Sequence, residues 1–379
     1  MKRIDFVYFE AGGGHRSAAN ALKAVIEQQA RPWDVRLVNL QEVLDSLDIF
    51  RKYLGIRLED IYNLLLRKGW TLGSAQMLPA MHGIIRLFHR GQVKLLRRFW
   101  STPKPDMVVS LVPNFNRAMF QALSAVDPGI PYVTVLTDLA DYPPHFWMER
   151  QPQYLICGTD RAVEQARRMG YSSERVFRTS GMILRPRFYE PVEIDRARER
   201  ERLGLRADLP TGLVLFGGEG SSAMVNIARE IDKAGTPVQL IFICGRNERL
   251  RARLDKLRTS FPKYVEGFTS EIPRYMALSD FFIGKAGPGS ISEALAMKLP
   301  VLVTRNALTL PQERYNADWV LEKDVGLLLP SFRRIGPAIR QLLDPEMFAR
   351  VRANAAAIEN RAVFEIPEIL EGILTRREA

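Results

Sequence analysis

Residues 281–295 read FFIGKAGPGSISEAL, and this stretch determines the fold predicted for the second half of the chain. The apolar run FFIG predicts a short strand, and the glycines and proline after it predict a tight turn. A helix then begins, with its first turn at Gly289–Glu293. Because a helix N-terminus presents unpaired backbone N–H groups, the stretch predicts a phosphate site after a strand of a parallel α/β sheet.

The polar residues of the same turn suit a nucleotide. Ser290 or Ser292 can cap the helix or contact phosphate, and Glu293, one turn in, can accept hydrogen bonds from both hydroxyls of a ribose. A plain capping motif needs only serine and glutamate. The added glycines and proline of Gly287–Gly289 therefore favour ligand binding and predict a nucleotide site.

Two more glycine loops and one polar cluster occupy comparable positions. His15 lies in the loop Glu10–Ser17 and is a candidate catalytic base, although such a histidine is more often structural or merely exposed. No G-x-G-x-x-G spacing is present there, which weakens a dinucleotide interpretation. The loop Phe216–Ser222 is either a second phosphate loop or a turn that binds nothing. A polar cluster then follows: Gln312, Glu313 and Asn316. These side chains can hydrogen-bond sugar hydroxyls, or they form the solvated start of a helix.

Short apolar strands alternate with helical stretches along the chain, which predicts two doubly wound parallel sheets. The predicted strands are Ile4–Phe9, Val35–Leu40, Met107–Val112, Tyr132–Leu136, Tyr154–Cys157, Val176–Thr179, Leu213–Phe216, Val238–Cys244, Tyr264–Glu266, Phe281–Ile283 and Pro300–Thr304. The charged, turn-rich stretch Glu190–Thr211 predicts a domain boundary, giving domains 1–189 and 190–379 that face each other across a cleft. The sequence leaves open which of the two domains the final helix, from about Pro345, packs on.

Composition excludes several classes of protein. The chain has 379 residues, of which 46% are hydrophobic and 26% are charged, so it folds without a long disordered arm. Cys157 and Cys244 each end an apolar strand, which predicts buried thiols rather than a disulfide framework or a metal site. No apolar run approaches about 20 residues, and the N-terminus does not read as a signal peptide. We therefore expect a cytoplasmic protein.

The positive charge is concentrated in one segment. The net charge is +11, and Arg51–Trp100 holds ten Lys or Arg against two acids, an excess of +8. Within it, residues 84–100 alternate apolar positions with a basic face at helical spacing: Arg86, Arg90, Lys94, Arg97 and Arg98. Such a helix can lie on an anionic bilayer with its apolar side inserted, or pack on the core with a solvated basic side. Nucleic acid is the weaker partner, because no binding module accompanies the charge.

With these loops placed, the chain resembles the diacylglycerol glycosyltransferases, which comprise the monogalactosyldiacylglycerol synthases and the processive diacylglycerol glucosyltransferases. The matching motifs follow the family's order over nearly the whole chain: GGGHRSAANAL, LTDLADYPPHFW, GMILRPRFY, LFGGEGS, ICGRNERL, EGFTSEIPRYMALSDFFIGKAGPGSISEAL and LPQERYNA. The resemblance implies the two-domain GT-B fold, a UDP-sugar bound in the C-terminal domain, and inversion at the anomeric carbon. It implies no catalytic metal and no cofactor besides the donor substrate.

The resemblance also implies roles for single residues. His15 would be the base, Asp138 would orient or assist it, and the acceptor side would include Gly13, Gly14, His145 and Trp147. The donor side would comprise Gly217, Gly218, Glu219, Gly220, Ser221, Phe268, Gly287, Pro288, Gly289, Ser290, Glu293, Gln312, Glu313 and Asn316. Pro311-Gln312-Glu313 lacks a glycine that relatives carry at this motif, which leaves the hexose open.

The expected function is transfer of a hexose, galactose or glucose, from a UDP-sugar to diacylglycerol or a related lipid, by an enzyme peripheral on the cell membrane. One alternative is a polyprenyl-linked or soluble acceptor. Another is a sugar-nucleotide epimerase, which shares the architecture. A third is a non-catalytic nucleotide-binding membrane scaffold.

Overall fold

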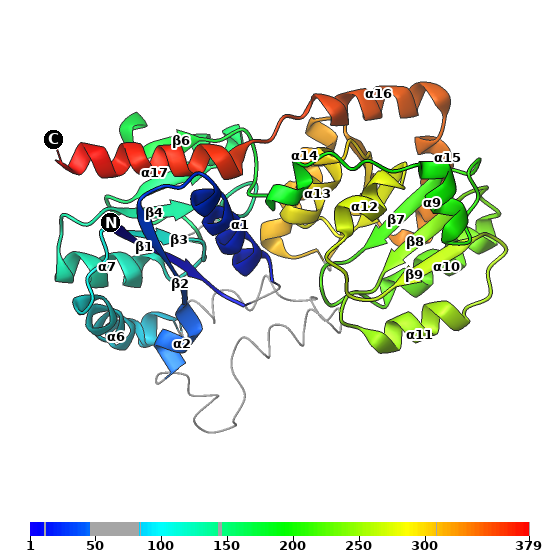
Figure 1. Ribbon diagram of the computed structural model, residues 1–379. Coiled ribbons are helices and arrows are strands. Elements are labelled where there is room, and N and C mark those ends of the chain that lie inside the picture. Colours follow the sequence, from blue (N-terminus) through cyan, green and yellow to red (C-terminus); the bar gives the residue numbers. More distant parts are fainter. Residues whose placement is uncertain (11–12, 46–82, 84, 143–145, 308, 379) are drawn as a thin grey trace. The chain divides into compact units, whose positions relative to one another are not determined.

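The computed structural model describes residues 1–10, 13–45, 83, 85–142, 146–307 and 309–378. Their contacts divide the chain into two compact units (Figure 1). The first takes in the described residues up to Pro186 together with those from Asn360 onward, and the second takes in Arg187–Glu359. Each unit has its own parallel sheet and is described separately below.

The first unit is built on six parallel strands in the order β2-β1-β3-β4-β5-β6. They are β1 Lys2–Tyr8, β2 Trp33–Asn39, β3 Met107–Ser110, β4 Tyr132–Val135, β5 Tyr154–Cys157 and β6 Val176–Arg178. The described helices are α1 Gly14–Gln28, α2 Leu40–Leu44, α6 His89–Ser101, α7 Asn116–Val126, α8 Asp160–Arg168 and α17 Ala362–Glu378, with the 3₁₀ turns η2 Ser173–Arg175 and η3 Pro186–Phe188. Strands β3 and β4 are buried along their whole length, as the unbroken apolar runs of a covered parallel sheet predict.

The last helix returns to the first unit. Helix α17 packs against α1 (Figure 1), and Arg31 forms an ion pair with Glu371 at 2.6 Å. Glu365 accepts a hydrogen bond from the backbone N–H of Ser180 at 2.7 Å. These contacts attach the end of the chain to the sheet that its beginning forms.

The second unit is also a six-stranded parallel sheet, in the order β12-β11-β10-β7-β8-β9. Its strands are β7 Thr211–Leu215, β8 Gln239–Ile243, β9 Lys263–Glu266, β10 Phe281–Gly284, β11 Val301–Thr304 and β12 Gly326–Leu329. Its helices are α9 Arg196–Arg202, α10 Ala223–Ala234, α11 Glu248–Lys256, α12 Ile272–Ala277, α13 Pro288–Ala296, α14 Arg314–Glu322, α15 Ile335–Leu342 and α16 Pro345–Ala357, with the 3₁₀ turns η4 Pro311–Glu313 and η5 Phe332–Arg334. The eleven predicted strands are present, but β12 was missed because Gly-Leu-Leu-Leu carries no β-branched or aromatic signal.

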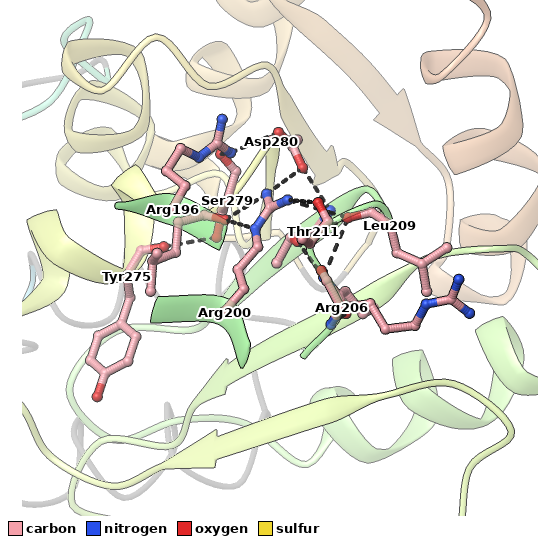
Figure 2. A network of polar contacts seen from close by, with 11 residues as sticks. Arg196, Arg200, Arg206, Leu209, Thr211, Tyr275, Ser279 and Asp280 are labelled. Atoms are coloured by element: carbon pink, nitrogen blue, oxygen red, sulfur yellow. Dashed lines mark hydrogen bonds and ion pairs between the residues drawn. The ribbon is translucent and has the colours of Figure 1, made fainter. Parts of the chain in front are cut away.

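A polar network holds the amino ends of two central strands of this second sheet (Figure 2). The guanidinium group of Arg200, which is buried, donates to the carbonyl of Leu278 at 2.8 and 2.9 Å and to Asp280 at 2.8 Å. Asp280 also accepts from the backbone N–H of Thr211, the first residue of β7, and from Arg196. This edge of the sheet is filled by internal contacts, so ligand loops belong at the opposite, carboxyl edge.

The structure decides between the two arrangements that the sequence left open for the basic helix. In α6 the side chains of Leu96 and Trp100 are fully buried in the core of the first unit, and the indole of Trp100 donates to Asp5 at 3.0 Å. The apolar side therefore packs on the core of the first unit, which is the second of the two arrangements that the sequence left open. The predicted basic side chains of Arg86 and α6 are exposed. The rest of the basic segment, residues 51–82 and 84, lies outside the described residues.

Candidate functional site

His15 lies in the first turn of α1, directly after the glycine loop. Gly13 precedes the helix with φ +76°, a left-handed conformation that favours glycine. A Cβ atom at Gly13 or Gly14 would meet nothing within 4 Å, and no side chain caps the helix. The first N–H groups of α1 are thus available beside His15, together with the positive end of the helix dipole.

The imidazole of His15 is held from the ends of two strands. Its Nδ1 lies 3.2 Å from the hydroxyl of Thr137, just after β4, and the ring also hydrogen-bonds the backbone of Leu111, just after β3. Burial lowers the pKa of His15 from 6.5 to about 4, against a smaller opposite effect of the Leu111 hydrogen bond. The ring is therefore neutral at pH 7, the state that a general base requires before it takes up a proton.

Trp147 packs beside this histidine and is itself held by Asp138. Trp147 is fully buried, with its ring centroid 6.0 Å from that of His15, and its indole N–H donates to the carboxylate of Asp138 at 2.9 Å. Its backbone N–H donates to Asp141 at 2.8 Å. Trp147 therefore lies in the protein interior beside His15, and its predicted place on the acceptor side stays a prediction. His145 lies outside the described residues.

Sequence reasoning missed Thr137, the hydroxyl partner of His15. The signal was its position: it directly precedes Asp138 in the Thr-Asp-Leu segment, where β4 reaches the carboxyl edge. Ligand-facing residues collect at that edge in open α/β sheets.

In the second unit, the loop Gly217–Ser221 packs tightly on the loop after β8. The carbonyl of Gly218 accepts from the backbone N–H of Arg246 at 2.8 Å. A Cβ at Gly245 would lie 2.1 Å from that carbonyl oxygen, and one at Gly220 would lie 2.6 Å from the carbonyl oxygen of the residue before Gly245. Both glycines have positive φ, +61° and +60° respectively, so no other residue fits easily. Gly218 itself stays exposed at the carboxyl edge.

The motif at residues 284–295 forms the turn and helix that its sequence predicts. Gly287 is the N-cap of α13 and Pro288 its first residue, and no side chain caps the helix. Ser290 and Ser292 are half-buried, and a Cβ at Gly289 would meet nothing within 4 Å. The helix start therefore offers uncapped N–H groups to an anion, since neither serine closes it. Glu293 lies half-buried one turn further along.

The predicted sugar residues are tied to this turn. Lys285 donates to the buried carboxylate of Glu313 at 2.7 Å, and the amide of Asn316 donates to the carbonyl of Ala286 at 2.9 Å. Asn316 is fully buried, so it holds the turn in place, whereas Gln312 is half-buried. Lys285 was not predicted as a site residue. Its ammonium group, paired with the Glu313 carboxylate, lies next to the turn where the diphosphate is expected.

An aromatic ring stands at the β8–β9 end of the same edge. The side chain of Phe268 is 61% exposed, and the guanidinium carbon of Arg246 lies 4.6 Å from the ring centroid. The turn before it is fixed by Glu266, which accepts from the backbone N–H of Gly267 and from two tyrosine hydroxyls. An exposed ring held by a rigid turn can stack on a nucleobase.

Comparison with known proteins agrees with this geometry. Residues 212–361 match the glycosyltransferase family 28 C-terminal domain. The chloroplastic monogalactosyldiacylglycerol synthase of Spinacia oleracea is 26% identical over 398 residues, which cover 99% of this chain and 73% of that protein.

Solved structures show the fold over the whole chain. MurG of Acinetobacter baumannii superposes with a TM-score of 0.61 at 14% identity and covers 98% of this chain and 100% of its own. The UDP co-structure of MnaA from S. aureus superposes with a TM-score of 0.60 at 16% identity and covers 99% of this chain and 97% of its own. The protein has the GT-B fold, and residues 212–361, nearly all of them in its second unit, are similar to the glycosyltransferase family 28 C-terminal domain.

Proposed function

We propose that the protein is an inverting glycosyltransferase that transfers a hexose, galactose or glucose, from a UDP-sugar to diacylglycerol or a related lipid. One observation carries the proposal: a neutral histidine stands at an uncapped helix start in the first unit. The second unit supplies a separate uncapped helix start and a lysine. One site suits deprotonation of a hydroxyl, and the other suits a departing diphosphate.

In this proposal the second unit binds the donor. The N–H groups at the start of α13 and the ammonium group of Lys285 bind the diphosphate and stabilise its negative charge as it leaves. Glu293 accepts from the ribose hydroxyls, Phe268 contacts the uracil, and the Gln312–Glu313 turn faces the hexose. The exposed backbone of Gly218 allows close approach of the diphosphate from the β7 side.

The first unit activates the acceptor. The acceptor hydroxyl donates its proton to His15 as its oxygen attacks C1 of the sugar from the face opposite UDP. The bond between C1 and the phosphate oxygen breaks, UDP leaves with the bonding pair, and the anomeric configuration inverts. Thr137 positions the imidazole for this transfer, and Trp147 with Asp138 keeps the ring in place from behind.

Exposed cations support peripheral contact with an anionic membrane. The side chains of Arg86, Arg90, Lys94, Arg97 and Arg98 are exposed, and Leu87 beside them is 77% exposed. Because the apolar side of α6 packs on the core, this contact is chiefly electrostatic. Within the described part of the chain, no helix combines the length and hydropathy that a membrane span requires.

The test is an assay of the purified protein with UDP-glucose, UDP-galactose and UDP-N-acetylglucosamine, each with diacylglycerol in mixed micelles. We expect UDP release together with a new glycolipid of inverted anomeric configuration. His15→Ala should abolish transfer while UDP still binds. Turnover only with a polyprenyl-linked or soluble acceptor would show that the acceptor belongs to that class and is not diacylglycerol. A changed sugar nucleotide without added acceptor would indicate an epimerase, and UDP binding with no transfer would indicate a scaffold.

A further inference from the structure

A small cavity opens beside the predicted hexose position. It has a volume of about 220 Å³ and is lined by Arg305, Asn306, Ala307 and Arg314. Three of these residues directly follow β11, and the fourth begins α14 immediately after the Gln312–Glu313 turn. Since β11 pairs with β10 in parallel register, the cavity lies at the same sheet edge as the Lys285–Gly287 turn.

The walls of the cavity are built from hydrogen-bonded backbone. The N–H of Arg305 donates to the carbonyl of Leu329 at 3.0 Å, and the side-chain amide of Asn306 donates to the carbonyl of Pro330 at 3.0 Å. Thr309 closes the turn, donating its backbone N–H to the carbonyl of Asn306 and accepting from the backbone N–H of the same residue. The loop is therefore fixed against the ends of β11 and β12.

The charge in this cavity is positive and incompletely neutralised. Arg305 forms an ion pair with Asp318 at 3.1 Å, one turn of α14 beyond Arg314. Arg314 is exposed and has no ion-pair partner among the residues that the structure describes. Two guanidinium groups facing one acid leave a surplus of +1. Guanidinium groups bind carboxylates through paired hydrogen bonds, which suits a planar anion.

We propose that the cavity binds the carboxylate of a hexuronic acid, so that the donor class of this enzyme includes nucleoside-diphosphate hexuronates. The inference rests on the proposed function, because it places the hexose at the Gln312–Glu313 turn. The cavity is smaller than the about 300–1,000 Å³ of pockets that enclose a drug-sized ligand, so it admits one group of a larger ligand. A carboxylate at C6 of a sugar held by the adjoining turn has the required charge and size.

The test compares UDP-glucuronate with UDP-glucose by calorimetric binding and by lipid transfer. Arg314→Gln removes the unpaired guanidinium group, and Arg258→Gln is the control, because it removes an exposed arginine of the same unit that does not line the cavity. We expect the wild-type protein and Arg258→Gln to bind UDP-glucuronate at least as tightly as UDP-glucose. Arg314→Gln should lower the ratio of the two affinities about 10- to 100-fold.

Four outcomes overturn the inference. Weaker binding of UDP-glucuronate than of UDP-glucose in the wild-type protein, with transfer of glucose intact, rejects the carboxylate subsite and leaves the proposed function standing. An unchanged affinity ratio in Arg314→Gln rejects the role of this cavity. Binding of inorganic phosphate that depends on Arg314, without discrimination between the two donors, assigns the cavity to a free anion instead. If no sugar nucleotide binds at all, both this inference and the proposed function fail.

Discussion

His15 shows how neighbouring atoms can change the chemistry of a single side chain. An ordinary histidine is partly protonated near pH 6.5, but burial lowers the pKa of His15 to about 4. The group therefore stays a free base throughout the physiological range, while Thr137 and Leu111 fix its orientation. The sequence shows which residue follows the glycine loop. The pKa depends on what the folded chain packs around it.

The pH dependence of activity follows from this pKa. We expect kcat/KM to hold as pH falls below 6.5 and to decline only near pH 4, where the imidazole takes up a proton. His15→Gln should lower kcat about 10²- to 10⁴-fold, and the decline near pH 4 should disappear from the pH profile. A decline centred on pH 6.5 in the wild-type protein would contradict a lowered pKa for His15.

Stability should depend on the same proton with a definite sign. In the unfolded chain His15 titrates near 6.5, whereas in the folded chain it titrates near 4, so between these values only the unfolded chain binds the proton. The stability of the wild-type protein relative to His15→Gln therefore falls as pH drops from 6.5 to about 4. Urea unfolding of both proteins at pH 7 and pH 4.5 measures the difference.

At the scale of elements, two connections of the second unit require glycine for different reasons. Gly245 has φ +61° and its Cβ position lies 2.1 Å from the Gly218 carbonyl oxygen, so it needs both a left-handed backbone and empty space. Gly235, which ends α10 with φ +56°, needs only the left-handed backbone, because a Cβ there meets nothing within 4 Å. Substitutions at Gly235 and Gly245 therefore distinguish the cost of a left-handed backbone from the cost of a steric clash.

Alanine at the two positions should therefore have different effects. Gly235→Ala should destabilise the protein by about 1 kcal/mol, the usual penalty for a left-handed non-glycine residue, and leave UDP affinity unchanged. Gly245→Ala should destabilise it further and weaken UDP binding, because the Gly217–Ser221 loop has to move. Urea unfolding and UDP calorimetry measure both effects. Equal UDP affinity in the two variants would show that this loop does not contact the nucleotide.

The exposed basic side chains of helix α6 predict binding to anionic membranes. Replacing Arg90, Lys94, Arg97 and Arg98 by glutamine should weaken binding to anionic vesicles, since each basic residue near such a surface contributes about 1 kcal/mol. The matched control replaces four exposed cations on and beside α11: Arg249, Arg253, Lys256 and Arg258. Flotation with phosphatidylglycerol vesicles at low and high salt measures binding. If both quadruple variants float equally, α6 is not the contact surface.

At the scale of the molecule, each unit has a sheet and a core of its own, and the amino edge of the second sheet is held by Arg200. Arg200→Met removes the buried donor of the Leu278 carbonyl and one partner of Asp280, which keeps Arg196 and Thr211, so it should destabilise the second unit by about 1–3 kcal/mol. Arg206→Gln, which breaks a pair between exposed side chains, should have little effect.

Hydrogen exchange measured peptide by peptide locates the effect of Arg200→Met. Amide protection should fall in β7 and β10 of the second unit, whose first residues adjoin the network, and persist in β1 and β3 of the first. Equal loss of protection in both sheets would show that the two units unfold together.

The sequence alone was sufficient where the signal is local. Apolar runs, glycine turns and helix starts lie within a few residues of one another, so eleven strands, the parallel α/β class and the turn at residues 284–295 follow from it. Strand β12 was missed because its four residues have no distinctive side chains and it forms by pairing with β11. The burial of both cysteines was also predictable from their apolar neighbours.

Only the tertiary structure decided the features that depend on distant residues. The apolar side of α6 is covered because α7 and α2 pack on it, and Thr137 meets His15 across 122 positions of sequence. Trp147 lies behind that histidine, Lys285 meets Glu313, and the final helix returns to α1. A sequence pattern shows that a side chain is apolar or charged. Which neighbour covers or pairs with it is set by the packing of the whole chain.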